Sequence, residues 1–458
     1  MTKQQRLVLV VSILASSVSG IDAFIVNVAL PTIAHSLHGG LAIQQWTVDA
    51  YTLTLGALIL VAGSLSDLFG RKQILLVGLI WFGAASLLCA LAPNSGWLVV
   101  ARALQGIGGA LLVPSSLAII ISTFTGPAQG KAIGIWTAWF SVSAVLGPLL
   151  GGVILALGSW RWIFAINVLP IALTVWLLLR LQLTERTSPG VQVDLPGAIL
   201  CAVGLGAPVY ALIEQPTHGW GDPLIYLLLI FGLLALGAFI VFERRAQQPM
   251  LPLSLFRVRN FTVGNIATLA IYAGLAVSSF SIVVTLQQVC GYSALQAGLA
   301  MLPVTIVMFL LSSRFGALAG RYGPRAFMTL GPLVAAVGFL FMLHLQPQAN
   351  YLTELLPGVL LFGLGLSMTV APLTSAVLGD IEARHAGVAS AVNNAVARVA
   401  GLIAVALVGV ITGAQLDIAG YRRVLMTVAV LLAAGGIISL FGIRTSRASN
   451  ETAEPISV

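Results

Sequence analysis

Charged residues are scarce in this sequence of 458 residues: Asp, Glu, Lys and Arg together make up 8% of it, whereas about 25% is typical of soluble domains. Hydrophobic residues make up 59%, and the mean hydropathy is +1.02. A soluble protein of this length cannot bury so much apolar surface, because its surface-to-volume ratio leaves too much of the chain exposed. The shortage of charge therefore excludes a soluble protein and predicts an integral membrane protein with the lipid bilayer around it.

Cysteine is also rare, with three residues that each stand alone in an apolar run: Cys89, Cys201 and Cys290. This spacing indicates neither a zinc site nor a disulfide framework, so we interpret them as small buried hydrophobes. A phosphate-binding loop is missing as well, because Gly126 to Lys131 has three residues between its glycines instead of four, and Ala132 follows. We therefore expect no metal, no cofactor and no enzymatic activity.

Long apolar runs recur along the whole chain. A helix that spans a bilayer needs about 20 mostly apolar residues, since each adds about 1.5 Å. The first run is too long for the apolar segment of a signal peptide and contains Asp22 and Asn27, so we interpret it as a transmembrane helix. The sequence predicts fourteen such helices, near 7–30, 46–66, 73–92, 97–123, 131–157, 162–181, 195–214, 223–242, 261–288, 294–318, 326–345, 352–378, 387–411 and 424–443.

The basic residues test this assignment. The formal net charge of +8 would suggest a nucleic-acid partner in a soluble protein, but here the basic residues fall mainly in short loops, and we expect no nucleic acid. If the N-terminus is cytoplasmic, sixteen of the 22 Lys and Arg lie on the cytoplasmic side and three lie outside. This asymmetry is typical of multi-pass proteins. It predicts a protein of the inner or plasma membrane with both termini in the cytoplasm.

An internal repeat indicates how the helices are grouped. Gly63-Ser-Leu-Ser-Asp-Leu-Phe-Gly-Arg-Lys72 follows the second predicted helix, and Gly316-Ala-Leu-Ala-Gly-Arg-Tyr-Gly-Pro-Arg325 follows the second of the last six. Gly320 stands where the first copy has Asp67. Because secondary transporters commonly contain such duplications, we expect an all-α protein of two six-helix bundles with two helices inserted between them. The predicted limits are 7–183 for the first bundle, 184–260 for the linker and inserted helices, 261–443 for the second bundle and 444–458 for a cytoplasmic tail.

Three charged residues lie in the outer half of the first predicted bundle. Asp22 lies roughly 12 Å below the outer end of its helix, and Asp49 and Arg102 lie nearer to the outer ends of theirs. A carboxyl group at such a depth is usually paired or lines a wet cavity. Burial favours its neutral form and a nearby cation favours its ionised form, so a conformational change can load and unload a proton. We expect Asp22 to couple transport to protons and Arg102 to modulate it, while a purely structural Asp22 stays open.

For Asp49 the sequence leaves several roles open, namely proton coupling, cation binding, or a solvated position that caps its helix. Other polar residues in the predicted spans are candidates for the lining of a substrate cavity. Those in the second bundle could instead satisfy one another within it. The candidates are Asn27, Tyr51, Gln105, Gln287, Gln288, Asn393, Asn394 and Arg398.

Four segments, in the same order, resemble the signatures of one family. Ile21 to Pro31 in the first helix is similar to the first-helix signature of the fourteen-helix drug:proton antiporter branch of the major facilitator superfamily, and Gly63 to Lys72 to the loop motif of that superfamily. Arg102 to Ala110 also fits, and Gly147 to Gly152 resembles the signature associated with antiporters. The resemblance extends from about residue 7 to residue 443.

This resemblance implies alternating access around a cavity at the membrane midplane, with the proton gradient as energy source. The substrates would be hydrophobic or amphipathic drugs or antibiotics, carried by a protein that we expect to be a monomer. Alternatives are a proton-coupled symporter, which the Gly147–Gly152 signature disfavours, and an exporter of one endogenous metabolite.

The resemblance also implies roles for two motifs. Asp67 and Arg71 would form a charge latch between the bundles, beside Gly63 and Gly70, which permit close approach or a sharp turn; the alternative is that these are ordinary topology-setting charges. In the fifth helix, small residues permit close contact and a proline can bend the helix, so this motif is a candidate seal against leak. Its residues are Gly147, Pro148, Gly151 and Gly152.

Overall fold

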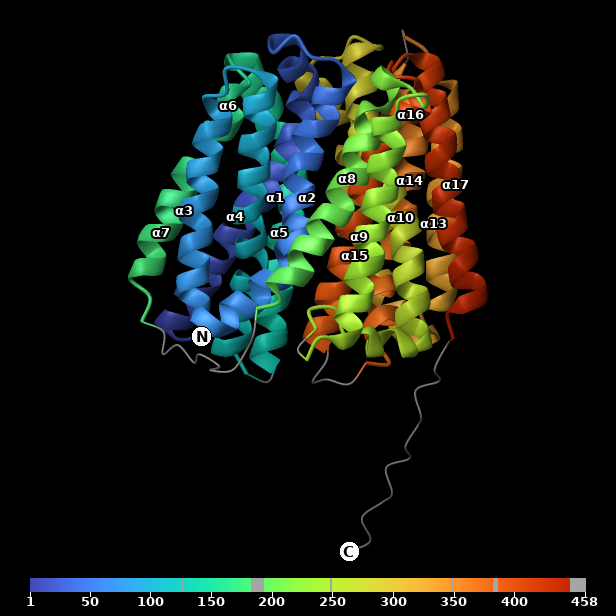
Figure 1. Ribbon diagram of the computed structural model, residues 1–458. Helices are drawn as coiled ribbons and strands as arrows, with labels where there is room; N and C mark the ends of the chain where they lie inside the picture. The colour runs from blue at the N-terminus through green and yellow to red at the C-terminus, as the bar shows by residue number, and fades with distance from the viewer. Residues whose placement is uncertain (126, 183–192, 248, 348–349, 382–385, 445–458) are drawn as a thin grey trace, which may run out of the picture.

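The computed structural model describes residues 1–125, 127–182, 193–247, 249–347, 350–381 and 386–444 (Figure 1). These residues form helices and no strand, which confirms the all-α prediction. Among them, 13 stretches of helix are long and apolar enough to cross a membrane, and Val145–Leu157 is a shorter apolar one within α5. The protein is therefore a multi-pass membrane protein, while the count of fourteen stays a prediction.

The helices of the first half are α1 (Lys3–Ser36), α2 (Leu41–Phe69), α3 (Arg71–Ala90), α4 (Ser95–Thr123), α5 (Pro127–Leu157), α6 (Arg161–Ala165) and α7 (Val168–Leu179). Two further helices follow, α8 (Leu195–His218) and α9 (Pro223–Arg245). The second half has α10 (Arg259–Gln288), α11 (Ala294–Ala300), α12 (Leu302–Tyr322), α13 (Arg325–Phe341), α14 (Leu356–Leu378), α15 (Ala386–Ala406), α16 (Val408–Thr412) and α17 (Ile418–Gly442). Short turns of helix precede α10 at Leu253–Arg257, follow α13 at Met342–His344 and precede α14 at Tyr351–Leu355.

Some predicted helices are interrupted. The helix expected near 162–181 is divided into α6 and α7, and Asn167 lies at the break. The helix expected near 294–318 is divided into α11 and α12, with Pro303 in the first turn of α12. Proline lacks an N–H and fits best at a helix start, which accounts for the second break. The helix expected near 387–411 is divided into α15 and α16.

The helices pack in two groups that lie side by side (Figure 1). Helices α1 to α7 contact one another, as do α10 to α17, while α8 and α9 pack together and lie across the seam between the groups. We call the first group the N-bundle and the second the C-bundle; the exact domain limits stay predictions. The start of α1 and the end of α17 lie at the same end of the molecule, here called the terminal end. The other end is called the opposite end.

The internal repeat has a structural counterpart. Gly70 between α2 and α3 has φ of +97° and Gly323 between α12 and α13 has φ of +87°, values that favour glycine. The basic residue two positions further on donates to a carbonyl of its own bundle in both copies. Lys72 Nζ donates to Leu181 O at 2.7 Å, and Arg325 Nε donates to Leu440 O at 2.8 Å. Each copy thus anchors the end of the last helix of its bundle.

Candidate functional site

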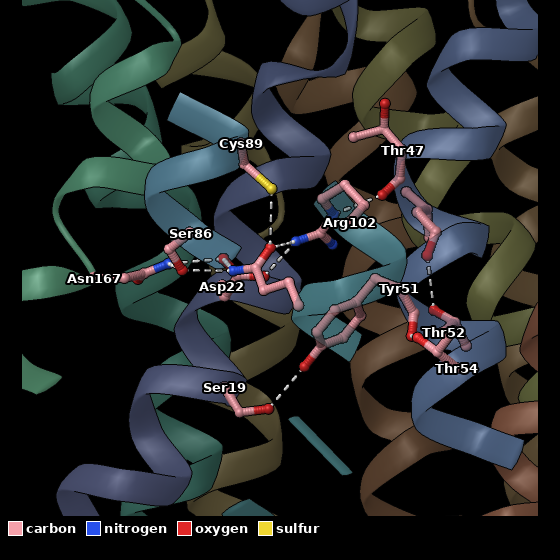
Figure 2. Close-up of polar contacts among 12 residues, drawn as sticks. Ser19, Asp22, Thr47, Tyr51, Thr52, Thr54, Ser86, Cys89, Arg102 and Asn167 are labelled. Atoms are coloured by element: carbon pink, nitrogen blue, oxygen red, sulfur yellow. Dashed lines mark hydrogen bonds and ion pairs between the residues drawn. The ribbon is translucent and has the colours of Figure 1, made fainter. Parts of the chain in front are cut away.

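The centre of the N-bundle contains a buried ion pair (Figure 2). Helix α1 supplies Asp22 and α4 supplies Arg102, and Arg102 Nη1 lies 2.7 Å from Asp22 Oδ2. The exposed fraction of the two residues is 0% and 1%. Burial of two charges is tolerated only when the geometry is good and further hydrogen bonds satisfy the remaining lone pairs. This pair meets both conditions.

The carboxylate of Asp22 has a donor on each oxygen. Oδ1 accepts from Gln105 Nε2 and from Asn167 Nδ2, both at 2.8 Å, while Oδ2 accepts from Arg102. Gln105 in turn donates to Ser86 Oγ at 2.9 Å and accepts from Arg102 Nη1 at 2.6 Å. Three donors, one of them cationic, thus satisfy the hydrogen-bonding capacity of both oxygens of this buried carboxylate.

Arg102 extends the cluster to α2. Its Nε donates to Thr47 O at 2.8 Å, and its guanidinium carbon lies 4.5 Å from the centre of the Tyr51 ring. The Tyr51 hydroxyl shares a hydrogen bond of 2.8 Å with Ser19 Oγ of α1 (Figure 2). The charge cluster, defined here as Asp22, Arg102, Gln105, Asn167 and Tyr51, therefore connects α1, α2 and α4 with the break before α7. It fixes these helices relative to one another.

Asp49 lies elsewhere on α2. Its exposed fraction is 0%, and neither carboxyl oxygen has a hydrogen-bond partner among the described residues. Gln45, one turn earlier, donates to two carbonyls of α15, and Gly56, two turns later, packs against Arg398 of α15. Residues at this spacing share one face of a helix, so Asp49 faces the C-bundle. A buried carboxylate without hydrogen-bond partners is costly.

The two bundles meet closely near the opposite end. Gln45 Nε2 donates to Val405 O at 2.7 Å and to Ala406 O at 3.0 Å. On another seam, Gln287 Nε2 of α10 donates to Val28 O of α1 at 3.0 Å. In contrast, Gly134, Thr137 and Trp139 toward the terminal end of α5 are exposed. The structure therefore has its opposite end closed between the bundles.

The glycine motif of α5 contributes to this closure. A Cβ atom at Gly147 would lie 2.6 Å from Phe24 Cβ of α1, and one at Gly152 would lie 2.5 Å from Leu295 Cα of α11. Pro148 lies against Gly298 of α11, where a Cβ would lie 3.0 Å from the proline ring. Gly151, like Gly147, faces α1. The motif thus lets α5 pack closely against α1 of its own bundle and against α11 of the C-bundle. Its role as a seal stays a prediction.

The loop motif is described only in part. Arg71 Nη1 donates to Ala118 O of α4 at 3.0 Å, and Gly70 forms the turn between α2 and α3. The side chain of Asp67 lies outside the described residues. A Cβ atom at Gly63 would meet nothing within 4 Å, so close packing does not require glycine there in this conformation. The predicted latch therefore stays a prediction.

The structure separates the residues proposed to line a cavity. Tyr51 and Gln105 are buried in the charge cluster, and Gln287 joins α10 to α1. Asn393 Nδ2 donates to Asn265 Oδ1 at 3.1 Å and to Thr268 Oγ1 at 2.9 Å, so it lies inside the C-bundle. The remaining four are at least partly exposed and make no hydrogen bond within the described part of the chain: Asn27, Gln288, Asn394 and Arg398.

A cavity of about 1030 Å³ opens between the bundles at the opposite end. Gln288 and Gln44 are among its lining residues, together with His35, Asp417 and Arg422. The Gln45 and Gln287 hydrogen bonds lie on the adjoining stretches of α2 and α10. This cavity is a polar vestibule on the closed side.

Sequence reasoning missed two polar partners. Asn167 completes the charge cluster, and its amide within an otherwise apolar run of α6 and α7 was the available signal. The second is Glu214 of α8, which accepts from Trp46 Nε1 at 2.8 Å. The rings of Trp46 and Tyr210 also lie 5.7 Å apart. Helix α8 is thereby fastened to α2 beside the seam.

Comparison with known proteins agrees with these features. The sequence profile of the Major Facilitator Superfamily matches residues 12–405. The puromycin resistance protein pur8 of Streptomyces alboniger is 39% identical over 89% of this chain and 82% of its own length. The multidrug resistance protein Stp of Mycobacterium tuberculosis is 33% identical over 91% and 78%. The methylenomycin A resistance protein of Bacillus subtilis is 32% identical over 88% and 87%.

Solved structures share the fold at low identity. A bacterial homologue of the human lysosomal transporter Spinster superposes with a TM-score of 0.69 and 16% identity, and covers 96% of this chain and 97% of its own. The peptide transporter POT in complex with sulfate gives a TM-score of 0.68 at 16% identity, over 96% and 94%. At this identity, the superposition shows the fold alone.

Proposed function

The chain belongs to the Major Facilitator Superfamily, and we propose that it exports hydrophobic or amphipathic drugs or antibiotics in exchange for protons, by alternating access. It is a transporter of small molecules and not an enzyme. The relatives named for resistance to puromycin, to multiple drugs and to methylenomycin A support drugs as substrates. We assign the terminal end to the cytoplasmic side of the inner or plasma membrane, because most of the basic loop residues lie at that end.

The contrast between the two buried acids is the observation that supports the proposal of proton coupling. Asp22 has three donors, including Arg102, whereas Asp49 has none among the described residues. Two acids share the region with one buried arginine of the N-bundle, so one acid is expected to hold a proton. We assign this proton to Asp49 in the state with the opposite end closed, because its carboxyl group lacks the donors that Asp22 has. Asp22 then keeps its charge and holds the N-bundle together, while it remains the second candidate for the proton.

The position of Asp49 connects its proton to movement of the bundles. Asp49 faces α15 one turn below the Gln45 hydrogen bonds, so opening of this seam hydrates its carboxyl group. Hydration favours ionisation, and closure favours the neutral acid. A proton from the outer side therefore promotes closure of the opposite end and return of the transporter to its inward-open state. The proton has to leave toward the cytoplasm before the seam reopens.

The proposal is tested by drug export in everted vesicles energised with a pH gradient. Puromycin is the first probe, because a relative at 39% identity is named for resistance to it. We expect Asp49→Asn to abolish uptake driven by the gradient while downhill movement persists, because an amide cannot exchange protons. Asp222→Asn is the matched control, since Asp222 is a partly exposed acid that caps α9 outside the spans, and Asn can cap a helix as well.

Three results decide between the assignments. Full activity of Asp49→Asn together with loss in Asp22→Asn would transfer the proton to Asp22. Proton coupling would be refuted if both variants transported as fast as the wild type and the wild type stayed equally active after the pH gradient was collapsed. Substrate movement in the same direction as the protons would identify a symporter instead.

A further inference from the structure

Arg398 lies near the middle of α15, at the seam between the bundles. A Cβ atom at Gly56 of α2 would lie 3.6 Å from Arg398 Cβ, so the side chain leaves α15 toward the N-bundle. The residue is partly exposed. Its charge is close enough to act on the phenol groups of Tyr51 in α2 and Tyr272 in α10. Arg398 is thus placed between the two bundles and is not directed into the C-bundle.

The neighbours of Arg398 around α15 define the space that it borders. Gly401 faces α10, where a Cβ would lie 3.1 Å from Ala276 Cβ, and Leu402 packs with residues of α8 on the other side. At about 100° per residue, Asn394 points between Arg398 and Gly401, away from the Leu402 face. Asn394 is exposed. Arg398 and Asn394 therefore share an accessible face of α15 that lies between α2 and α10.

The charge of Arg398 is uncompensated. It makes no hydrogen bond or ion pair with any described residue. The acid of the charge cluster, Asp22, is already paired with Arg102, and Asp49 makes no ion pair within the described part of the chain. A cation within the membrane normally pairs or marks the path of an ion or substrate. This accessible face of α15 therefore has an excess of positive charge.

We propose that Arg398 and Asn394 bind the anionic group of an amphipathic substrate, such as a carboxylate, sulfonate or phosphate. The proposal rests on the proposed transport function and adds anionic amphiphiles to its substrates; puromycin, which has no anionic group, tests the transport function alone. A guanidinium binds such groups through two parallel hydrogen bonds, and an amide adds a third donor. A phospholipid headgroup has the same chemistry, so the occupant is either a substrate or a lipid, and we assign it to a substrate.

Equilibrium binding to the purified, full-length protein tests this site without a proton gradient. Dansylglycine and dansylethylenediamine carry the same fluorophore with opposite charges. We expect the wild type to bind dansylglycine more tightly. Arg398→Gln should weaken dansylglycine on the order of tenfold to a hundredfold, the range of a lost charge-assisted hydrogen bond, and leave dansylethylenediamine unchanged. Arg314→Gln, in an exposed position of α12, is the matched control.

Two further variants keep the test decisive if Arg398→Gln does not fold. Arg398→Lys retains the charge and should weaken dansylglycine only a few-fold, and Asn394→Leu, at an exposed position, should do the same without affecting dansylethylenediamine. Equal loss of both probes, a preference for the ammonium probe, or binding of neither would overturn the proposal. Displacement of dansylglycine by phosphatidylglycerol but not by phosphatidylcholine in nanodiscs would assign the site to a lipid and also overturn it.

This assay separates the inference from the function on which it rests. A protein that binds dansylglycine through Arg398 but shows no gradient-driven export would contradict the antiport proposal alone. A protein that exports puromycin with a proton gradient but binds dansylglycine independently of Arg398 would contradict the substrate class alone.

Discussion

Removal of Arg102 should make the stability of the protein depend on pH. In the wild type, its guanidinium donates to Asp22, Gln105 and the carbonyl of Thr47 within a fully buried site. Arg102→Gln leaves the Asp22 carboxylate with two neutral amide donors. Loss of one partner of a buried ion pair costs about 3–5 kcal/mol. We expect this full loss of stability at alkaline pH, where the Asp22 carboxyl group of the variant is ionised.

At acidic pH the loss should be smaller, because Asp22 can take up a proton and become neutral. The remaining cost is then that of the other hydrogen bonds, about 1 kcal/mol each. The sign follows from linkage: the variant's folded state binds a proton more readily than its unfolded state, so its stability falls as the pH rises. The measurement is the free energy of unfolding in detergent at pH 5.5 and pH 8.

A double variant provides the internal control. Asp22→Asn with Arg102→Gln has no uncompensated charge, so it should be more stable at pH 8 than Arg102→Gln alone. Arg422→Gln, which removes an exposed arginine at the opposite end, should change little at either pH. The reasoning is refuted if Arg102→Gln loses the same stability at both pH values, or if the double variant shows the sum of both single losses.

Two further predictions concern glycines with matched controls in the same motif or helix. Gly152→Ala should reduce transport by at least severalfold in the vesicle assay, because its Cβ would lie 2.5 Å from Leu295 Cα and would separate the bundles; Gly134→Ala in the same helix meets nothing within 4 Å and should remain active. Gly70→Ala should destabilise the fold by about 1–2 kcal/mol, since φ is +97° there. Gly63→Ala should be neutral in the same unfolding measurement, and comparable losses for both would contradict the geometry.

The sequence predicted the positions of residues along the helices better than their directions around them. The apolar runs and the 1.5 Å rise placed Asp22, Asp49 and Arg102 at similar depths, and two of the three are indeed in contact. The direction in which a side chain points depends on how the helices are rotated against one another. That rotation is set by packing, such as the fit of Gly106 against Tyr51, and a single sequence contains no direct record of it.

The same limit explains why the residues proposed to line a cavity are separated in the structure. Gln105 is one turn from Arg102, and an amide in an apolar span is as suitable for binding a substrate as for binding Asp22. The partner that decides between these roles, Asn167, comes from a break in a helix more than sixty residues away along the chain. For residues of α15 the pattern was more informative. Asn393 and Asn394 are adjacent, so they must point in different directions, and one lies in the bundle while the other faces solvent.

The two faces of α2 together suggest how a rigid bundle can release its partner. One face carries Thr47 and Tyr51 into the charge cluster, which holds α2 firmly within the N-bundle. The other face holds α15 through the two hydrogen bonds of Gln45, worth about 1 kcal/mol each. Contacts between the bundles are thus weaker than those within the N-bundle, as alternation between two states a few kcal/mol apart requires. In the proposed mechanism, protonation of Asp49 on the weaker face shifts the balance between the two states.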